Sequence, residues 1–509
     1  MKKLAFLFLT FALSMTLLGG CVVSAPDSRP WLLDTAVASD SLVKNLPTSL
    51  QLILPTPRPE GSAYYSPTPD ASHTLPVIRT EEVSYTVQSG DYLALIAARY
   101  NLPLVALVNA NTAIDPNILE AGMVLTIPAP QPAPVISDFK IIPDSELVNG
   151  PVSATLDIKA FVTQKGGYLS TYSEDVEGVT LTGAEIVQRI CYEYSVNPRL
   201  LLALLDYQTG WVTRTQLDPS YITYPMGRFE TNREGLYRQL AWTADTLNKA
   251  YYRYQINALP YLILADGNLV QLSTLINPGT AAVQYLMAQL HDQYGFQLAV
   301  SETGVYATYT NFFGIPFDLT INNLVPIDLT QPTLILPFEN GAAWSFTGGP
   351  HGGWGSGSAW AALDFAPPGE AFGCVQSDAW VVAAADGLVI RAKDGAVLLD
   401  LDGDGLEQTG WTLLYMHIES RDRVSAGTYL KAGDRIGHPS CEGGVSNGTH
   451  LHLARRYNGE WISADTNLPF NLEGWISSGD GAEYDGILSR DGLNVIAWDG
   501  RIAENQIQR

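Results

Sequence analysis

Two proline-rich segments divide the chain, and they constrain its fold more than any other feature of the sequence. The first surrounds "PTPRPEGSAYYSPTPD", and the second, "PAPQPAPVISD", begins at Pro128. Segments of this composition behave as extended tethers rather than as parts of a core. A chain of 509 residues is also too long for one core, and its length suggests about three domains. The expected divisions are a leader (1–20), a tether (21–83), a small domain (84–128), a linker (129–164), a helical domain (165–325), a β domain (333–475) and a C-terminal extension (476–509).

The composition suits folded domains and argues against one class of partner. Charged residues make up 16% and hydrophobic residues 46% of the chain, as in globular proteins. The formal net charge of −23 makes nucleic acid an unsuitable partner, because a nucleic-acid surface needs clustered Lys and Arg.

The N-terminus has the pattern of an export signal. "MKK" supplies positive charge, and the apolar stretch that follows, "LAFLFLTFALSMTLL", has 15 residues, which is short for a spanning helix. No later stretch is long and apolar enough to cross a membrane. The stretch ends in "LGGC", which resembles the bacterial lipobox. The resemblance implies cleavage before Cys21, lipidation of Cys21 and membrane anchoring outside the cytoplasm, in a bacterial envelope; an ordinary signal peptide is the alternative.

Residues 85–128 form a pattern of strand, helix, helix and strand. The segment runs "YTVQSGDYLALIAARYNLPLVALVNANTAIDPNILEAGMVLTIP", with apolar residues at helical spacing on both sides of a proline. It resembles the LysM domain along its whole length. The resemblance implies binding of glycans that contain N-acetylglucosamine, as in peptidoglycan, through loops that include Gly90, Asp91, Asn111 and Ile114. An inert βααβ spacer is the alternative.

The region 165–325 is predicted to be mainly α-helical. Thr182 and Glu185 form a capping box before an apolar helical pattern, and Asn197-Pro198 supplies a cap and first residue for the next helix. Further helical patterns follow in "GLYRQLAWTADTLNKAYY" and "GTAAVQYLMAQLHDQY".

One helix of this region resembles the catalytic helix of lysozyme-like lytic transglycosylases. The matching stretch is "VNPRLLLALLDYQTGW", but Gln208 stands where that family has its catalytic glutamate. Glycoside cleavage needs a proton donor of raised pKa, which an amide cannot supply. We expect a degenerate lysozyme-like domain that holds glycan with Tyr207 and Trp211 without cleaving it; a purely structural helical domain is an equal alternative.

From residue 333 the chain changes to short strands separated by Asp-Gly turns, which predicts an all-β domain with an antiparallel sheet. With the parts before it, this makes a multidomain α+β protein. Five of the seven histidines lie here, at 351, 417, 438, 450 and 452. His450 and His452 should project from the same face of a strand, with Leu451 turned into the core.

These residues contain the ligand types of a zinc hydrolase. Such a site needs three protein ligands and an open fourth position for water. His351, Asp364 and one histidine of the pair would supply the ligands. The other histidine and His417 would handle protons and the developing negative charge.

The order of motifs makes the expectation more specific. "GGPH", "ALDFAPPGE", "VVAAADGLVIRA", "LLYMHI", "YLKAGDRIG" and "GTHLHL" follow one another, and the series resembles the lysostaphin-type (LytM-like) zinc metallopeptidases. The resemblance implies His351, Asp364 and His452 as Zn²⁺ ligands and His417 and His450 as catalytic residues. It implies a peptidoglycan endopeptidase that cleaves stem-peptide or cross-bridge amide bonds. The alternative is an inert peptidoglycan-binding scaffold or an activator of other hydrolases.

Two departures from this family accompany the resemblance. Between His351 and Asp364 the chain has the twelve residues "GGWGSGSAWAAL", where the family has a shorter connection. After the second histidine, Ala454 and Arg455 stand where the family has a glutamate that is not a metal ligand.

The remaining motifs receive simpler interpretations. Of four cysteines, Cys21 is expected to carry lipid and Cys191 to be buried in a helix, and Cys374 and Cys441 are predicted to pair, since an exported protein can keep a disulfide. His438 is expected to be structural. "DLDGDG" spaces its aspartates at 400, 402 and 404 as calcium loops do, without the bidentate glutamate, so a hairpin turn and a calcium site both remain open.

Overall fold

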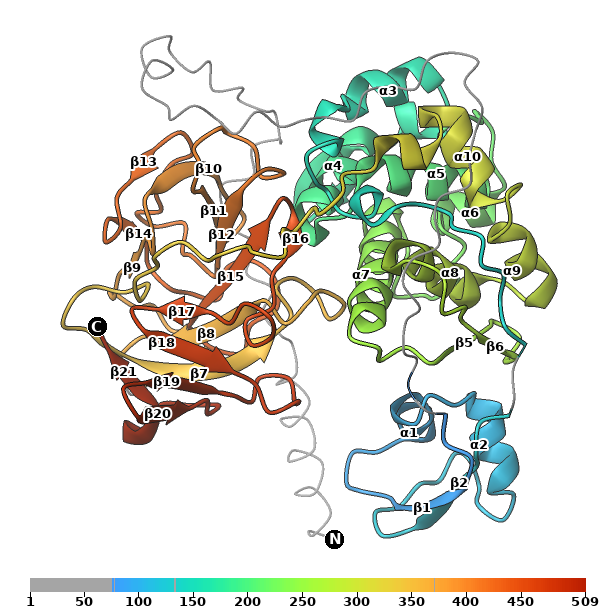
Figure 1. Cartoon of the computed structure of the whole chain (residues 1–509), viewed down its shortest axis with the longest axis horizontal. Helices are drawn as coiled ribbons and strands as arrows, with labels where there is room; N and C mark the ends of the chain where they lie inside the picture. Colours follow the sequence, from blue (N-terminus) through green and yellow to red (C-terminus); the bar gives the residue numbers. More distant parts are fainter. Residues whose placement is uncertain (1–75, 77, 132–133, 370) are drawn as a thin grey trace, which may run out of the picture.

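The computed structural model describes residue 76 and residues 78–131, 134–369 and 371–509. The predicted leader, the lipobox with Cys21 and most of the predicted tether lie outside these residues. In Figure 1 the chain forms a small blue unit, a helical unit coloured teal to yellow, and a β unit coloured orange to red. The predicted mixture of helical and antiparallel β parts is confirmed.

The small unit is the predicted βααβ arrangement. Strands β1 (Val83–Thr86) and β2 (Val124–Ile127) pair antiparallel, and helices α1 (Leu93–Arg99) and α2 (Leu104–Ala110) connect them. Its core is small, and the side chains of Ile96 and Leu107 are fully buried in it. Among the described residues no single helix is long and apolar enough to cross a bilayer; α1 and α2 meet that criterion only as a pair bent by 108°.

The helical unit is built around one continuous apolar core. Both predicted helix starts are confirmed: Thr182 and Glu185 form the capping box of α4, and the Asn197 side chain caps α5 with Pro198 in the first turn. Cys191 is buried within α4 as predicted. The helices are α3 (Ile158–Lys165), α4 (Gly183–Tyr194), α5 (Pro198–Thr209), α6 (Pro219–Thr223), α7 (Leu236–Gln255), α8 (Pro278–Leu290), α9 (Gln293–Ala299) and α10 (Val305–Phe313). Two hairpins accompany them, β3 (Ser173–Val176) with β4 (Val179–Thr182) and β5 (Tyr261–Ile263) with β6 (Leu269–Gln271).

The linker expected over residues 129–164 is shorter than predicted. Ile141, Ile142 and Leu147 are fully buried in the helical core, and α3 begins at Ile158. The segment lacks a helical or strand period because much of its backbone is irregular. Some of its backbone groups nonetheless bond to distant partners: the amide of Asn149 donates to the Ser195 carbonyl.

The β unit is dominated by a sheet of nine strands. Its order is β13-β10-β11-β12-β15-β8-β7-β21, with β16 paired to β15, and every pairing is antiparallel. The strands of this sheet are β7 (Ala343–His351), β8 (Ala362–Ala366), β10 (Gly387–Lys393), β11 (Ala396–Asp400), β12 (Trp411–Met416), β13 (Tyr429–Leu430), β15 (Leu451–Tyr457), β16 (Glu460–Trp461) and β21 (Gln506–Gln508). Smaller sheets join β9 (Val381–Val382) with β14 (Arg435–Gly437), and β17 (Asn471–Leu472), β18 (Trp475–Ser478), β19 (Ile487–Arg490) and β20 (Leu493–Ile496) in series.

The predicted C-terminal extension, residues 476–509, belongs to the β unit. Its last strand, β21, pairs with β7, and Ile507 is buried in the same core as Trp344 and Leu453. The sequence boundary at residue 475 was wrong because these strands are short and their partners lie far away along the chain.

The β unit and the helical unit are in direct contact. The turn between β15 and β16 reaches the helical unit, where the Ser195 hydroxyl donates to the Gly459 carbonyl at 2.5 Å. Trp461 donates its indole N–H to the Tyr194 carbonyl at 3.3 Å. Strand β15 therefore enters this interface a few residues after its predicted metal ligand.

Candidate active site

Strand register places two of the predicted ligands opposite each other. His452 on β15 and Asp364 on β8 are direct cross-strand partners, so their side chains leave the same face of the sheet. Their neighbour Leu453 points to the other face, into the core. His351 ends the adjacent strand β7, where shifts in the β7–β8 register bring it beside them.

The predicted ligands form one tight and buried group. His351 Nε2 lies 3.0 Å from His452 Nδ1, and Asp364 Oδ1 lies 3.2 Å from each of these nitrogens. Tetrahedral Zn²⁺ ligands about 2.0–2.1 Å from the ion are about 3.3 Å from one another. His351, Asp364 and His452 thus form a group that could hold a metal ion.

Hydrogen bonds fix the tautomers of both ligand histidines. His351 Nδ1 is 2.8 Å from the Gly349 carbonyl and His452 Nε2 is 3.2 Å from the Gly353 carbonyl. A carbonyl only accepts, so each of these ring nitrogens carries the proton and donates. In the neutral rings the two nitrogens that face each other are then both lone pairs, an arrangement that a cation between them would resolve. Metal-bound histidines show this pattern of a second hydrogen bond to a carbonyl.

Asp364 adds a second sign of fit to a cation. Its Oδ1 atom is buried and has no hydrogen-bond partner among the described residues. Burial opposes the charge of this carboxylate, but the imidazoles of His351 and His450 hold the pKa of Asp364 well below its usual range. An ionised, unpaired oxygen in a buried position is costly unless a positive group binds it.

His450 and His417 flank the ligand group without joining it. His450 donates Nδ1–H to the Gly448 carbonyl at 2.7 Å, which leaves Nε2 free, 3.7 Å from Asp364 Oδ2. His417 donates Nδ1–H to the Glu442 carbonyl at 3.1 Å, and its ring centroid is 4.4 Å from that of His450. The backbone of His417 has φ 63°, a left-handed conformation that is uncommon outside glycine and concentrates at functional sites.

The environment keeps His417 uncharged. Burial, together with the nearby imidazoles of His450 and His452, lowers the pKa of His417 to about 3. With its Nδ1 proton engaged, the free Nε2 atom of the neutral ring is an acceptor.

Tyr484, which the sequence did not indicate, completes one side of the group. Its ring stacks on that of His351, with centroids 4.3 Å apart and planes 21° apart. The Tyr484 backbone exchanges hydrogen bonds with Gly349 and Pro350, next to this histidine. Burial and the negative charge of Asp364 raise the pKa of Tyr484. No local pattern could have identified this residue, which comes from the C-terminal segment.

The predicted disulfide is confirmed. Cys374 and Cys441 are bonded, with Cα atoms 5.7 Å apart. The amide of Thr449 donates to the Gly373 carbonyl at 3.0 Å, so the same two loops meet again just before His450. The bridge therefore joins the segment that leads into β15 to the loop after β8.

His438 lies outside the metal group, consistent with a structural residue. It is buried, its Nδ1–H donates to the Ala379 carbonyl at 2.8 Å, and its ring packs on Trp380.

The carboxylates of Asp400, Asp402 and Asp404 lie close enough together to hold a cation. Backbone amides of the same loop already bind all three carboxylates, as in a tight turn.

Two of the predicted glycan-binding side chains have partners inside the small unit. Asp91 accepts from the Tyr85 hydroxyl at 2.6 Å and from the Gln88 amide at 2.8 Å. Asn111 bonds the backbone of Thr126 through both its amide and its carbonyl. Gly90 and Ile114 lie in the two loops, at the predicted positions, and the glycan-binding role of all four residues stays a prediction.

The helical unit corrects one expectation about glycan contact. Trp211 is fully buried, donates its indole N–H to the Tyr221 carbonyl, and packs on Tyr168 and Tyr172. It cannot touch a glycan, because a buried indole contacts only the core. Gln208 is half-buried, with its side-chain nitrogen 3.1 Å from His291 Nε2.

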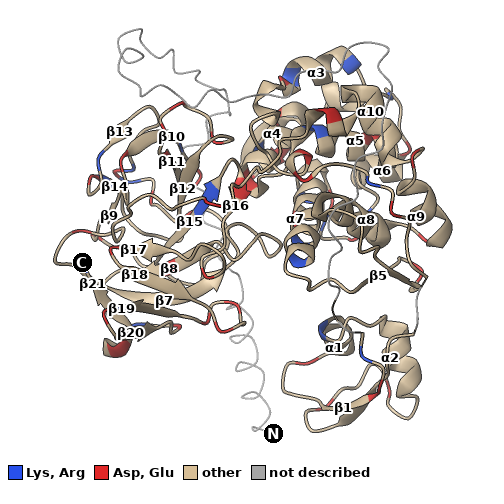
Figure 2. Ribbon diagram, in the orientation of Figure 1, with Lys and Arg blue, Asp and Glu red and all other residues tan. Residues whose placement is uncertain are grey.

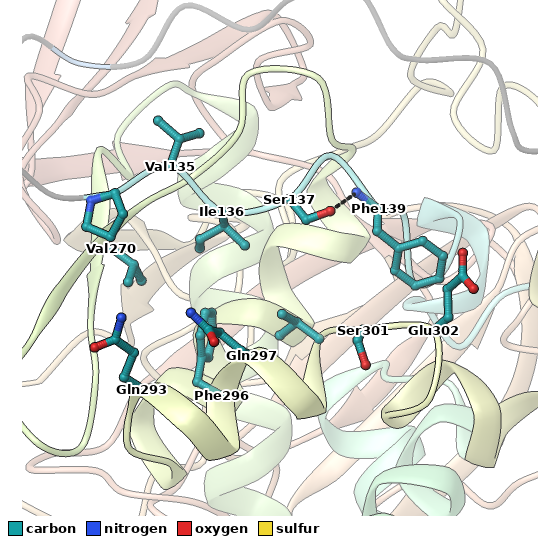
Figure 3. Close-up of a pocket in the computed structure, with 12 residues that line it drawn as sticks. Val135, Ile136, Ser137, Phe139, Val270, Gln293, Phe296, Gln297, Ser301 and Glu302 are labelled. Atoms are coloured by element: carbon teal, nitrogen blue, oxygen red, sulfur yellow. Dashed lines mark hydrogen bonds between the residues drawn. The ribbon is translucent and has the colours of Figure 1, made fainter.

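A cavity of about 430 Å³ lies in the helical unit, next to α9. Figure 3 shows its largely apolar lining, with Val135, Ile136 and Phe296 around it and Glu302 at one side. No residue of the metal group lines it. In Figure 2, Lys and Arg lie on several elements of the described residues rather than on one.

Three parts of the chain match known families. Residues 85–128 match the LysM domain, residues 140–325 match LasA, N-terminal domain, and residues 368–464 match Peptidase family M23. The chain therefore combines a LysM domain with a peptidase domain of family M23, and the M23 match contains His417, His450 and His452. The helical unit matches from residue 140, in agreement with its buried start, whereas the lysozyme-like resemblance of residues 165–325 stays a prediction.

Two relatives that match part of the chain are proteases. The chain is 27% identical over 293 residues to protease LasA of Pseudomonas aeruginosa, in strain PAO1 and in strain UCBPP-PA14. The matched region covers 53% of this chain and 65% of each relative, so the chain spans less than two thirds of their length.

Two solved structures are also similar. The M23 metalloprotease pseudoalterin from the deep sea is 25% identical, with 33% of this chain and 97% of that chain covered and a TM-score of 0.28. The catalytic domain of lysostaphin from Staphylococcus simulans is 25% identical, with 24% and 87% covered and a TM-score of 0.18.

Proposed function

We propose that this protein is a zinc endopeptidase of the bacterial cell envelope that cleaves stem-peptide or cross-bridge amide bonds of peptidoglycan. The observation that carries the proposal is the arrangement of His351, Asp364 and His452. Two lone pairs and an unpartnered carboxylate oxygen meet within 3.2 Å in a buried position. His351, Asp364 and His452 would hold the ion.

Zinc bound by these residues would polarise the scissile carbonyl and lower the pKa of a water molecule. This chain's own residues would supply the remaining chemistry. His450 and His417 each keep one ring nitrogen fixed on a carbonyl, and the other nitrogen of His450 lies 3.7 Å from Asp364 Oδ2.

The neutral Nε2 atom of His417 can accept a hydrogen bond and so orient the attacking water. His450, whose free Nε2 lies beside the Asp364 carboxylate, suits taking the proton that the attacking water loses and passing it to the leaving amine. General acid and base groups of this kind contribute about a hundredfold to ten-thousandfold in rate. Because both rings are held by backbone carbonyls, little reorganisation is needed when the substrate binds.

The LysM domain would hold the enzyme on its polymer by binding glycan that contains N-acetylglucosamine. Since Asp91 and Asn111 are engaged inside the domain, the loop backbone around Gly90 and Ile114 is the better candidate for glycan contact.

The lipid on Cys21 would tether the chain to the membrane; Cys21→Ala should move the protein to the soluble fraction. Retention of that variant on the membrane would contradict the anchor.

With Gln208 in place of an acid, the helical unit should not cleave glycan strands. Release of anhydro-muropeptides that depends on residues 165–325 would contradict this. The alternative function, an inert scaffold or hydrolase activator, predicts no stoichiometric zinc.

The direct experiment is mass analysis of muropeptides released from purified sacculi. The zinc-loaded protein should yield products with a new peptide amino terminus, and chelation should abolish them. Release only in the presence of a second hydrolase would favour the activator.

A further inference from the structure

The connection between His351 and Asp364 leaves the β unit and ends on a helix of the helical unit. Asp245, on α7, accepts a hydrogen bond at Oδ1 from the Gly357 amide at 2.8 Å. Its Oδ2 atom accepts one from the Ser356 hydroxyl at 2.9 Å. Both oxygens of one carboxylate therefore bind the tip of the loop that joins two predicted metal ligands. In Figure 1 this loop extends from the β unit toward α7.

The loop approaches α7 so closely that two positions at its tip, 355 and 357, have no room for a Cβ atom. A Cβ atom on Gly357 would lie 1.9 Å from the Asp245 carbonyl oxygen. A Cβ on Gly355 would lie 2.5 Å from Asp245 Oδ1, and Gly355 also has φ +65°. Beside them, the ring of Trp354 meets that of Tyr194 edge-on, with centroids 6.4 Å apart. The Gly/Ser-rich sequence of the loop is what this close contact requires.

The other end of the loop touches a predicted metal ligand. The carbonyl of Gly353 accepts the Nε2–H of His452 at 3.2 Å, the bond that fixes the tautomer of this ring. Gly353 is held in turn by its amide, which donates to the Ala359 carbonyl at 3.1 Å across the loop. It also packs against the ring of Trp461, where a Cβ would come within 2.5 Å. A continuous set of contacts thus runs from Asp245 through the loop to His452.

We propose that Asp245 is a positioning residue for the metal site. It holds the loop so that Gly353 keeps His452 in the tautomer and orientation that present Nδ1 beside His351 and Asp364. The helical unit is then part of the catalytic apparatus without touching substrate. This inference rests on the proposed function, because it assigns His452 to the metal.

The test is zinc affinity of the full-length chain, measured by competition with a chromogenic chelator. Asp245→Ala should weaken zinc binding by about tenfold, the lower end of the range for groups that orient metal ligands, because it acts through the loop. The zinc affinity of Asp245→Asn should lie between those of the wild type and Asp245→Ala, since the amide oxygen of asparagine can still accept a hydrogen bond from the Gly357 amide. Lys249→Ala is the matched control: this exposed residue lies one turn further along α7, and its variant should bind zinc as the wild type does.

A second readout separates positioning from general stability. Hydrogen exchange at the Gly357 amide should accelerate in Asp245→Ala, while the thermal unfolding midpoint stays as in Lys249→Ala. Ser356→Ala removes one of the two bonds without altering α7. If Asp245→Ala does not fold, Ser356→Ala replaces it in the zinc-binding measurement. Its loss of zinc affinity should be smaller than the roughly tenfold loss expected for Asp245→Ala.

The outcomes are distinct. A wild-type chain that binds no zinc would overturn the proposed function itself. Wild-type zinc binding with unchanged affinity in Asp245→Ala and Ser356→Ala would overturn only the role of Asp245. Higher turnover of a cross-bridge peptide by Asp245→Ala would also overturn it, because the loop would then obstruct the site.

Discussion

His351 and His452 face each other with Nε2 and Nδ1 3.0 Å apart, and in its neutral form each ring donates its one proton to a backbone carbonyl elsewhere. Two lone pairs at this distance repel unless a positive group lies between them. Asp364 Oδ1, buried and without a partner among the described residues, completes the same triangle. The position suits a dication held by three protein ligands.

The stacking of Tyr484 on His351 gives a prediction that distinguishes the contribution of the tyrosine ring from that of its hydroxyl. Tyr484→Ala should weaken zinc binding by roughly fivefold, since a stacked aromatic pair contributes about 1 kcal/mol. Tyr484→Phe keeps the ring and should bind zinc as the wild type does. Chelator competition on both variants measures this; an equal loss in both would show that the stacking has no part in holding His351.

The disulfide between Cys374 and Cys441 should stabilise the β unit. It closes a loop with a sequence separation of 67 residues, for which the chain-entropy account gives about 4 kcal/mol. Replacing both cysteines with serine should lower the unfolding midpoint of this unit and leave the helical unit unchanged. Intact mass after alkylation without reductant should show neither cysteine modified, and two modified thiols would refute the bridge.

Glu146 predicts a pH dependence of the helical unit. Burial raises its pKa from 4.5 to about 7, against the opposing effects of Arg199 and the Tyr309 hydroxyl. The folded state therefore binds this proton more tightly than the unfolded state. The stability it contributes is fully present below pH 4.5 and is lost as the pH rises through 7.

The unfolding free energy lost when Glu146 gives up its proton is about 3 kcal/mol at most. Glu146→Gln should remove it, so the unfolding free energy of the helical unit should change less between acid and neutral pH than in the wild type. Thermal unfolding across this range measures the difference, with the exposed Glu302→Gln as control. A wild-type profile as flat as that of Glu146→Gln would contradict the prediction.

Local patterns in the sequence were sufficient for much of this architecture. Thr182 with Glu185, and Asn197 with Pro198, specify helix starts through contacts within one turn. The alternation of His450, Leu451 and His452 fixed which side chains share a face, because the strand period is two.

Features that depend on distant contacts were missed. Tyr484 reaches His351 from a segment that had been assigned to an extension, and Asp245 meets Gly357 across 112 positions of the chain. Trp211 matched a pattern for glycan contact, but tertiary packing buried it. The segment before Ile158 has no period, because irregular backbone can be buried when distant groups satisfy its hydrogen bonds.

The central claim is that His452 binds zinc and His450 acts beside it. The most direct test is zinc content, set against turnover of a cross-bridge peptide, in His452→Ala and His450→Ala. His452→Ala should lose both zinc and activity, because one of three ligands is gone. His450→Ala should keep stoichiometric zinc and lose about a hundredfold to ten-thousandfold in turnover. Zinc lost from His450→Ala and kept in His452→Ala would reverse the assignment, and zinc and activity kept in both would show that the active site lies elsewhere.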